Sequence, residues 1–207
     1  MERYDCPVYV ANDSHMAALA EYTFGEQRDS PNLIVIKASR GVGAGIVING
    51  RPFYGDGYGA GEIGHVVVVE GGASCSCGNA GCLETVSSST AILNKARQSV
   101  PDADWTWVMD ALQNEDADIA KIVADAGKYL GITIANLIGN FNIHHIVVAG
   151  RVATIGQPLV DAMEQEISRR MLPSLAADTK ITLSTAGTDI VLLGSAAMVL
   201  QHELGII

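Results

Sequence analysis

Aromatic and basic residues are both scarce in this sequence, and each scarcity excludes a class of protein. Phe, Trp and Tyr make up 5% of the 207 residues, so a core has to be built from Val, Ile, Leu and Ala. Lys and Arg number 13 against 23 Asp and Glu, which gives a formal net charge of -10. No basic stripe interleaved with aromatic side chains occurs, and so acidic a chain repels a phosphate backbone. The chain by itself is therefore not expected to bind nucleic acid.

Long hydrophobic runs are missing as well. None reaches the roughly 20 residues of a membrane span, and the N-terminal stretch MERYDCPVYVANDSH has no apolar core of signal-peptide length. These absences predict a cytoplasmic protein that makes no membrane contact. In a reducing compartment thiols stay free, so the 4 cysteines are available to a metal rather than to disulfides.

Apolar residues, in contrast, are abundant, at 48% of the chain with a mean hydropathy of +0.24. Their spacing indicates a mixed α/β domain in which strands come first and helices then alternate with strands. Gly127 and Gly131, four residues apart on the longest predicted helix, are expected to let a neighbouring element pack closely. Strands are predicted at 8–10, 32–39, 43–50, 66–69, 144–150 and 180–185, and helices at 14–25, 114–142, 155–172 and 189–205.

Three cysteines and a histidine lie close together in GEIGHVVVVEGGASCSCGNAGCLE, residues 61–84. Cys75, Cys77 and Cys82 are spaced C-x-C-x4-C, and two glycines in the second gap allow the backbone to turn sharply. With His65 they make three thiolates and one imidazole, the closed tetrahedral set of a structural zinc site. The spacing differs from the common C-x2-C pattern, so spacing alone leaves two alternatives open, a set of disulfides or inert thiols.

The same segment contains two glutamates, in E-x-G-H (62–65) and in C-x-C-G-x2-G-C-x-E (75–84). In this order the two motifs resemble the signature of the ROK family, which joins sugar-responsive bacterial repressors and sugar kinases. ANDSHMAALAEYTFG and GVGAGIVINGRPFYGDGYGAGEIGH extend the resemblance over nearly the whole chain. It implies an α/β fold of the actin-like ATPase or ribonuclease H-like type. That fold is a mixed sheet with flanking helices and a zinc-stapled loop, meaning a loop tied together by one zinc ion.

The resemblance also implies a sugar effector as ligand and a homodimer or homotetramer as the assembly. Carboxylates accept pairs of sugar hydroxyls through charge-assisted hydrogen bonds, and an asparagine offers both donor and acceptor. A zinc ion in the loop would hold both glutamates in place before the ligand arrives, which lowers the ordering cost of binding. The implied zinc ligands are His65, Cys75, Cys77 and Cys82, and the implied sugar-binding residues are Asn12, Asp13, Glu62, His65 and Glu84.

The family contains kinases as well as repressors, and the phosphate-binding motifs favour a repressor. Asp13 matches the position of the family's catalytic base, so it would be catalytic only if the chain is a kinase. The first phosphate loop of the kinases, D-x-G-x-T, does not occur in these residues. In the second loop Arg40 stands where the kinases have the threonine of G-T-G, and Arg151 stands where they usually keep a glycine. Because phosphoryl transfer depends on such loops, ATP and magnesium are expected only under the kinase alternative.

The sequence therefore predicts the sugar-sensing, effector-binding part of a ROK-type transcriptional repressor. The alternative is a truncated ATP-dependent sugar kinase, and a third interpretation is a zinc-stapled interaction domain that binds no sugar. Residues 1–30 are expected to be the remnant of an N-terminal lobe and hinge. Residues 31–207 are expected to be the C-terminal lobe, with the sugar, zinc and oligomerisation surfaces. DNA would be contacted only through an upstream domain that these residues do not encode.

Overall fold

A five-stranded sheet forms the centre of the computed structural model, which describes residues 6–26, 28 and 30–205. Its strand order is β3–β2–β1–β4–β5. β1 pairs antiparallel with β2, as does β2 with β3, whereas β1, β4 and β5 run parallel. The sheet is therefore mixed, as the sequence predicts. The strands are β1 (Leu33–Ala38), β2 (Val42–Ile48), β3 (Arg51–Phe53), β4 (His145–Ala149) and β5 (Lys180–Leu183).

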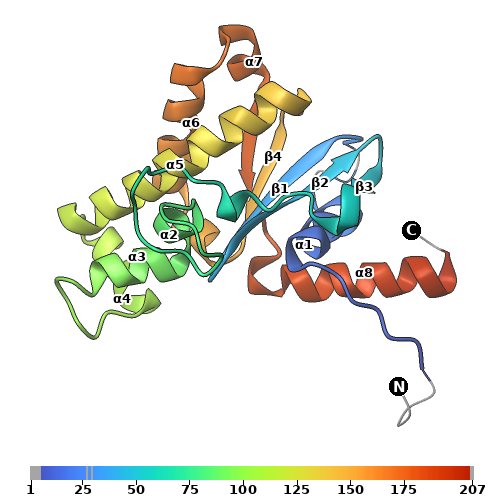
Figure 1. Ribbon diagram of the computed structural model, residues 1–207, viewed down its shortest axis with the longest axis horizontal. Helices are drawn as coiled ribbons and strands as arrows, with labels where there is room; N and C mark the ends of the chain where they lie inside the picture. The colour runs from blue at the N-terminus through green and yellow to red at the C-terminus, as the bar shows by residue number, and fades with distance from the viewer. Residues whose placement is uncertain (1–5, 27, 29, 206–207) are drawn as a thin grey trace.

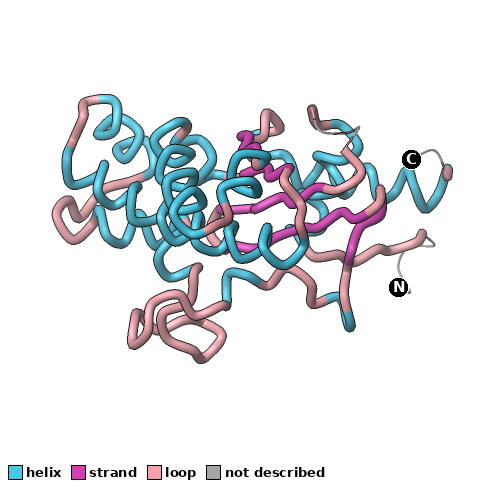
Figure 2. The backbone as a smooth tube through the Cα atoms, turned by 90° about the horizontal axis from the view of Figure 1, so that it is seen from above, coloured by secondary structure: helices cyan, strands magenta, loops and turns pink. Residues whose placement is uncertain are grey.

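Helices cover both faces of this sheet (Figure 1). On one face α1 (Asp13–Phe24) packs beside α8 (Ile190–Leu204), and on the other α5 (Ala117–Phe141) packs beside α6 (Gln157–Arg170). Figure 2 shows the strands lying side by side among these helices. The remaining helices are α2 (Glu84–Ser87), α3 (Ser89–Ala96), α4 (Trp105–Gln113) and α7 (Pro173–Asp178), with 3-10 turns η1 (Asp56–Tyr58), η2 (Ile63–His65), η3 (Arg151–Ile155) and η4 (Gly187–Asp189).

The central strand β1 explains why the sequence folds in three layers. Ile34 and Ile36 belong to the larger core, together with α5 and α6. Leu33 and Val35 belong to a smaller core, together with α1. Because successive side chains of a strand point to opposite faces, a strand that is covered on both faces needs a continuous apolar run. The run LIVI in β1 meets that need.

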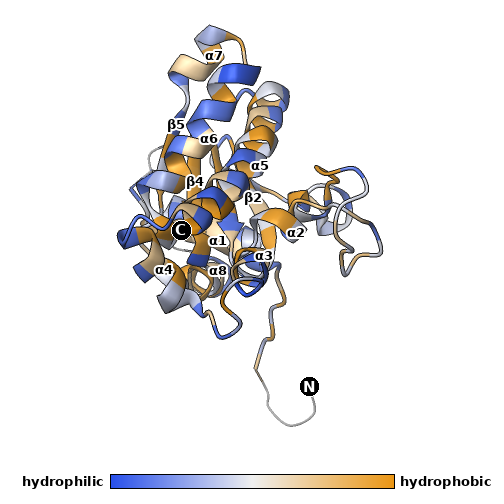
Figure 3. Ribbon diagram, turned by 90° about the vertical axis from the view of Figure 1, so that its left-hand side faces the viewer, coloured by the Kyte–Doolittle hydropathy of each residue, from blue (hydrophilic) through white to orange (hydrophobic). Residues whose placement is uncertain are grey.

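The long helix α5 confirms the predicted helix and its glycine contacts. Figure 3 shows hydrophilic and hydrophobic residues alternating along α5. A Cβ on Gly127 would lie 2.6 Å from the Cβ of Ala162, and a Cβ on Gly131 would lie 2.6 Å from the carbonyl oxygen of Met163. Both contacts are with α6, so the two glycines allow the backbones of α5 and α6 to approach closely.

Two strand predictions are wrong. Residues 8–10 form no strand, because no neighbouring strand among the described residues offers them backbone partners. Val10 is accordingly 94% exposed. Residues 66–69 form no strand either, and only Val67 makes an isolated bridge, to Cys82. Apolar composition favours a strand at both places, but a strand also needs a partner of matching register.

Other differences concern short elements. β2 ends at Ile48, and Asn49 and Gly50 then turn with φ of 51° and 74°, which returns the chain into β3, a strand that the sequence analysis did not predict. The helices α2, α3, α4 and α7 were not predicted from the sequence either. None of the helices within the described ranges is long and apolar enough to span a membrane.

The proposed boundary at residue 30 stays a prediction. Residues 1–5 of the proposed N-terminal part lie outside the described residues. The helix α1 packs on β1, on β2 and on α8.

Candidate functional site

The three cysteines and the histidine converge at the end of a loop that leaves the sheet after β3. The ligand atoms of His65, Cys75, Cys77 and Cys82 all lie within 4.8 Å of one another. Gly81 makes this convergence possible, since its φ is 78° and a Cβ there would lie 1.6 Å from the carbonyl oxygen of Val69. The predicted cluster is therefore present, and all its cysteines are free thiols rather than disulfides.

The distances within this cluster suit zinc. Zinc–sulfur bonds of about 2.3 Å in a tetrahedron place neighbouring sulfurs about 3.8 Å apart. The Sγ atoms of Cys77 and Cys82 are 3.7 Å apart, and the Sγ atom of Cys75 is 3.5 Å from Nδ1 of His65. The four side chains thus form a possible metal-binding group, and zinc itself stays a prediction.

The thiols of this cluster differ in acidity. A hydrogen bond from the Cys77 backbone lowers the pKa of Cys75 to about 6, and burial raises the pKa of Cys82 to about 12. The hydrogen bond with Cys75 in turn raises the pKa of His65. Metal binding requires deprotonated thiols, so zinc would displace the proton that Cys82 otherwise holds. Because Nδ1 of His65 faces Cys75, its Nε2 is the atom left for a ligand.

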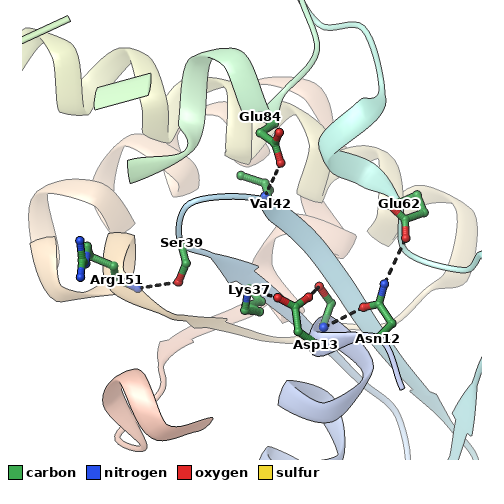
Figure 4. A network of polar contacts seen from close by, with 9 residues as sticks. Asn12, Asp13, Lys37, Ser39, Val42, Glu62, Glu84 and Arg151 are labelled. Carbon is green, nitrogen blue, oxygen red and sulfur yellow. Dashed lines mark hydrogen bonds and ion pairs between the residues drawn. The ribbon is translucent and has the colours of Figure 1, made fainter. Parts of the chain in front are cut away.

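The five residues implied to bind sugar line one cavity of about 150 Å³, together with Lys37 and the start of β2. Asn12 is the N-cap of α1, and its Oδ1 accepts a hydrogen bond from the Ser14 backbone. Nδ2 of Asn12 donates to Oε1 of Glu62 at 3.2 Å (Figure 4). Because Asn12 is the cap, Asp13 lies in the first turn of the helix.

The second glutamate reaches the cavity from the start of α2. Oε2 of Glu84 accepts a hydrogen bond of 3.2 Å from the backbone N–H of Val42 (Figure 4). A Cβ on Gly41 would lie 2.8 Å from that same oxygen, so a larger residue there would require the carboxylate to shift. Similarly, a Cβ on Gly64 would lie 2.0 Å from the carbonyl oxygen of Val42, which explains the glycine of E-x-G-H. The two motifs thus pack against the same strand, β2.

Lys37 is a residue of this cavity that sequence reasoning missed. Its Nζ lies 2.5 Å from Oδ2 of Asp13, and its side chain is only 12% exposed. A strong signal was available, because a single lysine interrupts the apolar run of β1 and must find an acidic partner when it is buried. The carboxylate of Asp13 is therefore already paired with the ammonium group of Lys37.

A second missed feature is a larger cavity of about 500 Å³ next to Asn12. It lies between α1, α8 and the loop after β3. Its aromatic side chains make contact with one another: His15 lies edge-on to Tyr54, and Tyr9 stacks on His202. Because these residues come from separate parts of the chain, no local pattern could predict the cavity.

The two arginines that replace small residues of the phosphate loops are both exposed. Arg40 lies in the β1–β2 turn, and the backbone N–H of Arg151 donates to Oγ of Ser39 in that turn at 3.1 Å. His144 bonds to Thr179 and to Asn142, away from the cavity, which agrees with a structural role.

Comparison with known proteins decides the family. The model of the ROK family matches residues 1–202. The chain belongs to the ROK family. It therefore has the actin-like fold that its motifs predict, with a mixed sheet and flanking helices.

Relatives of this ROK protein include both kinases and regulators. It is 35% identical to a glucokinase of Halalkalibacterium halodurans over 218 residues, which cover 98% of this chain and 66% of the relative. It is 36% identical to the DNA-binding transcriptional dual regulator NagC of Escherichia coli over 193 residues, 88% of this chain and 48% of NagC. A crystal structure of a ROK family transcriptional regulator, a homologue of the E. coli MLC protein, has a TM-score of 0.79 and 34% identity, covering 93% of this chain and 52% of that one.

These similarities leave the activity open. The identities to a kinase and to a regulator, 35% and 36%, are nearly equal. The chain also spans only about half to two thirds of the length of these relatives, since the covered shares are 66% and 48%. The comparisons therefore establish the family, and its regulators and sugar kinases remain the two candidate activities.

Proposed function

We propose that this chain is the sugar-sensing, effector-binding part of a ROK-type transcriptional regulator of carbohydrate metabolism. Sugar hydroxyls would be bound by Asn12, Asp13, Glu62, His65 and Glu84, which line one cavity. A carboxylate has two acceptor oxygens, and each bond to a hydroxyl is charge-assisted, so three carboxylates in one cavity suit a polyhydroxylated ligand.

The metal group supports the same site. One zinc ion, held by His65 and the three cysteines of the cluster, would tie together the loop that joins Glu62 to Glu84. Its role would be structural, since four protein ligands leave no open coordination position. His65 would connect the two sites, with Nδ1 on the metal side and Nε2 toward the sugar.

The contact between Lys37 and Asp13 is the observation that favours a sensor over a kinase. A kinase of this family would use the Asp13 carboxylate to accept the proton of the sugar hydroxyl that attacks phosphate. Here Oδ2 of Asp13 lies 2.5 Å from the ammonium group of Lys37. A sugar hydroxyl would therefore have to share this oxygen with the ammonium group. The arginines in the two phosphate-loop positions point the same way.

In a sensor, sugar binding would shift an equilibrium between arrangements of lobes or subunits, because the ligand binds one arrangement more tightly than the other. Contact with DNA would come from a domain outside this chain, and homo-oligomerisation would couple the subunits. The alternative is a sugar kinase with ATP and Mg²⁺ as cofactor and Asp13 as base, and the identity to a glucokinase supports it.

The test uses the protein in its natural full length. Calorimetry over a panel of glucose, xylose and N-acetylglucosamine should find a sugar that binds. Asp13→Asn should weaken that binding by about 1.5–3 kcal/mol, since it removes a charged acceptor. Asp110→Asn, an exposed aspartate on α4, is the matched control and should bind normally.

A coupled assay for ADP release, with ATP and Mg²⁺ supplied, separates the two activities. We expect no ADP release that depends on sugar. Sugar-dependent release that is abolished by Asp13→Asn would replace the sensor with the kinase. Absence of binding by every sugar would favour a zinc-stapled interaction domain instead.

A further inference from the structure

The sulfurs of the metal group differ in how far solvent reaches them. Cys77 is exposed, whereas Cys82 is 0% exposed. Their Sγ atoms are nevertheless only 3.7 Å apart, and the Sγ atom of Cys75 faces Nδ1 of His65 instead. An oxidant from solvent can therefore reach the sulfur of Cys77, and Cys82 then offers a second sulfur beside it.

The backbone around these two cysteines allows their sulfurs to bond. A disulfide holds its sulfurs about 2.05 Å apart, so this pair has to close by roughly 1.7 Å. Cys82 is held in place, because it pairs with Val67 in a β-bridge. Cys77 lies in the turn of residues 75–79, where Gly78 has a φ of 97° and nothing within 4 Å of its Cβ position. The turn therefore has open space in which Cys77 can move toward Cys82.

A bond between these sulfurs would remove two of the four side chains that could hold a metal. The thiolate is the form of cysteine that binds metal, and a sulfur in a disulfide no longer carries that charge. The two remaining ligands, His65 and Cys75, leave the tetrahedral set half complete. Glu62 is three residues from His65, and Glu84 is two residues from Cys82. The same bond would therefore act on both glutamates of the sugar cavity.

We infer that Cys77 and Cys82 form a redox switch, in which a peroxide converts the two thiolates to a disulfide, frees the metal and weakens sugar binding. This inference rests on the proposed sugar site and its zinc, and it adds a second signal to which the site responds. A dithiol reverses the switch by thiol–disulfide exchange. The protein thus responds to oxidising conditions as well as to sugar.

The reaction balances with hydrogen peroxide as the oxidant. The thiolate sulfur of Cys77 attacks one peroxide oxygen, the O–O bond breaks, and a sulfenic acid and hydroxide form. The thiolate of Cys82 then attacks the sulfur of Cys77, the S–S bond forms, and the S–O bond breaks to release a second hydroxide. The two sulfurs lose two electrons, which reduce the peroxide, and two protons from solvent convert the hydroxides to water.

Titration of the full-length protein with hydrogen peroxide tests the switch. A chromophoric chelator measures released zinc, mass spectrometry of an unreduced digest locates the disulfide, and calorimetry with glucose, xylose and N-acetylglucosamine measures sugar affinity. We expect one zinc to be released for each disulfide between Cys77 and Cys82. Sugar affinity should fall at least about tenfold, because the ligand then has to order both glutamates itself. A dithiol with added zinc should restore the metal and the affinity.

Variants assign the bond to one pair of cysteines. Cys75→Ser retains both proposed partners and should still form the disulfide when peroxide is added. Cys77→Ser lacks the exposed sulfur and should form none. Cys6→Ser removes an exposed cysteine outside the metal group, and this control should release zinc as the natural protein does. A disulfide in Cys77→Ser, or none in Cys75→Ser, would overturn the assignment.

The outcomes separate this inference from the proposed function. If peroxide forms the disulfide and sugar affinity does not change, the switch is wrong and the sugar sensor stands. If peroxide leaves Cys77 and Cys82 unpaired, or if the untreated protein holds no zinc, the switch is wrong as well, and sugar binding by the untreated protein still supports the sensor. If the untreated protein binds no sugar, both proposals fail.

Discussion

Single residues of the metal group differ in what surrounds them. Cys82 is fully buried, and the backbone carbonyl of His65 accepts a hydrogen bond from its thiol. Cys77 is exposed, so its side chain contributes little to packing, and its sulfur is the part that matters for metal binding. Cys6 is also exposed, far along the chain from the metal group. Loss of metal can therefore be separated from loss of packing by the choice of cysteine.

We expect Cys77→Ser to remove tightly held zinc while the fold persists. Structural zinc contributes roughly 10–16 kcal/mol of apparent binding energy in small peptide sites, and a hydroxyl in place of a thiolate forfeits much of it. Elemental analysis should find one zinc per chain in the natural protein and close to none in the variant. Cys6→Ser is the control and should retain its zinc. A natural protein that lacks zinc although its thiols are intact would contradict the prediction.

At the scale of elements, the contact between α5 and α6 depends on backbones that approach closely. Gly131 is buried on α5, and a Cβ there would lie 2.6 Å from the carbonyl oxygen of Met163. Gly139 lies on the same helix with nothing within 4 Å of its Cβ position. The two glycines share a helix and a helical conformation, and they differ in their surroundings. They therefore form a matched pair.

Gly131→Ala should destabilise the protein by about 1–3 kcal/mol, since the added methyl group forces the helices apart. Gly139→Ala should instead leave stability unchanged or raise it by up to about 1 kcal/mol, because alanine favours a helix. Urea unfolding monitored by circular dichroism measures both. Equal effects of the two substitutions would mean that α5 and α6 do not pack as described.

At the scale of the molecule, the loop of residues 61–84 is joined to the body at its two ends. The carbonyl oxygen of Gly61 accepts from the Ala44 backbone, and Leu83, together with Ile63, belongs to the larger core. Between these ends the loop has few backbone hydrogen bonds to the sheet. Within the loop, backbone hydrogen bonds join Val68 and Val69 to Gly81 and join Gly81 to Ala73, and a metal ion would add a cross-link to the same segment.

Removal of metal by a chelator should therefore act locally. Amide hydrogen exchange should rise within residues 66–82, while β1 and α5 stay protected, because local opening needs less free energy than global unfolding. Sugar affinity should fall at the same time, since Glu62 and Glu84 lose their fixed positions. Readdition of zinc should restore both. Exchange that rises equally throughout the chain would show that the metal supports the whole fold.

The sequence by itself determined the features that depend on neighbours along the chain. The cysteine motif places three thiols within a few residues of one another, so their convergence needs only a glycine turn. In α5 the helical repeat of apolar residues indicates which side chains are buried, and in β1 the continuous apolar run does so. Both patterns can be read without knowledge of the tertiary structure. His65 lies ten residues before Cys75; its imidazole completes a set of four ligands, and the family resemblance supports that assignment.

Only the tertiary structure decided the features that depend on distant partners. The runs at 8–10 and 66–69 have strand composition, yet no strand in the described part of the chain lies beside either to complete its hydrogen bonds. Lys37 lies on a strand and Asp13 on a helix, and their contact exists because α1 packs across β1. The type of a residue determines how favourable burial or a polar contact is for it, whereas the packing of separate elements determines which partner it contacts.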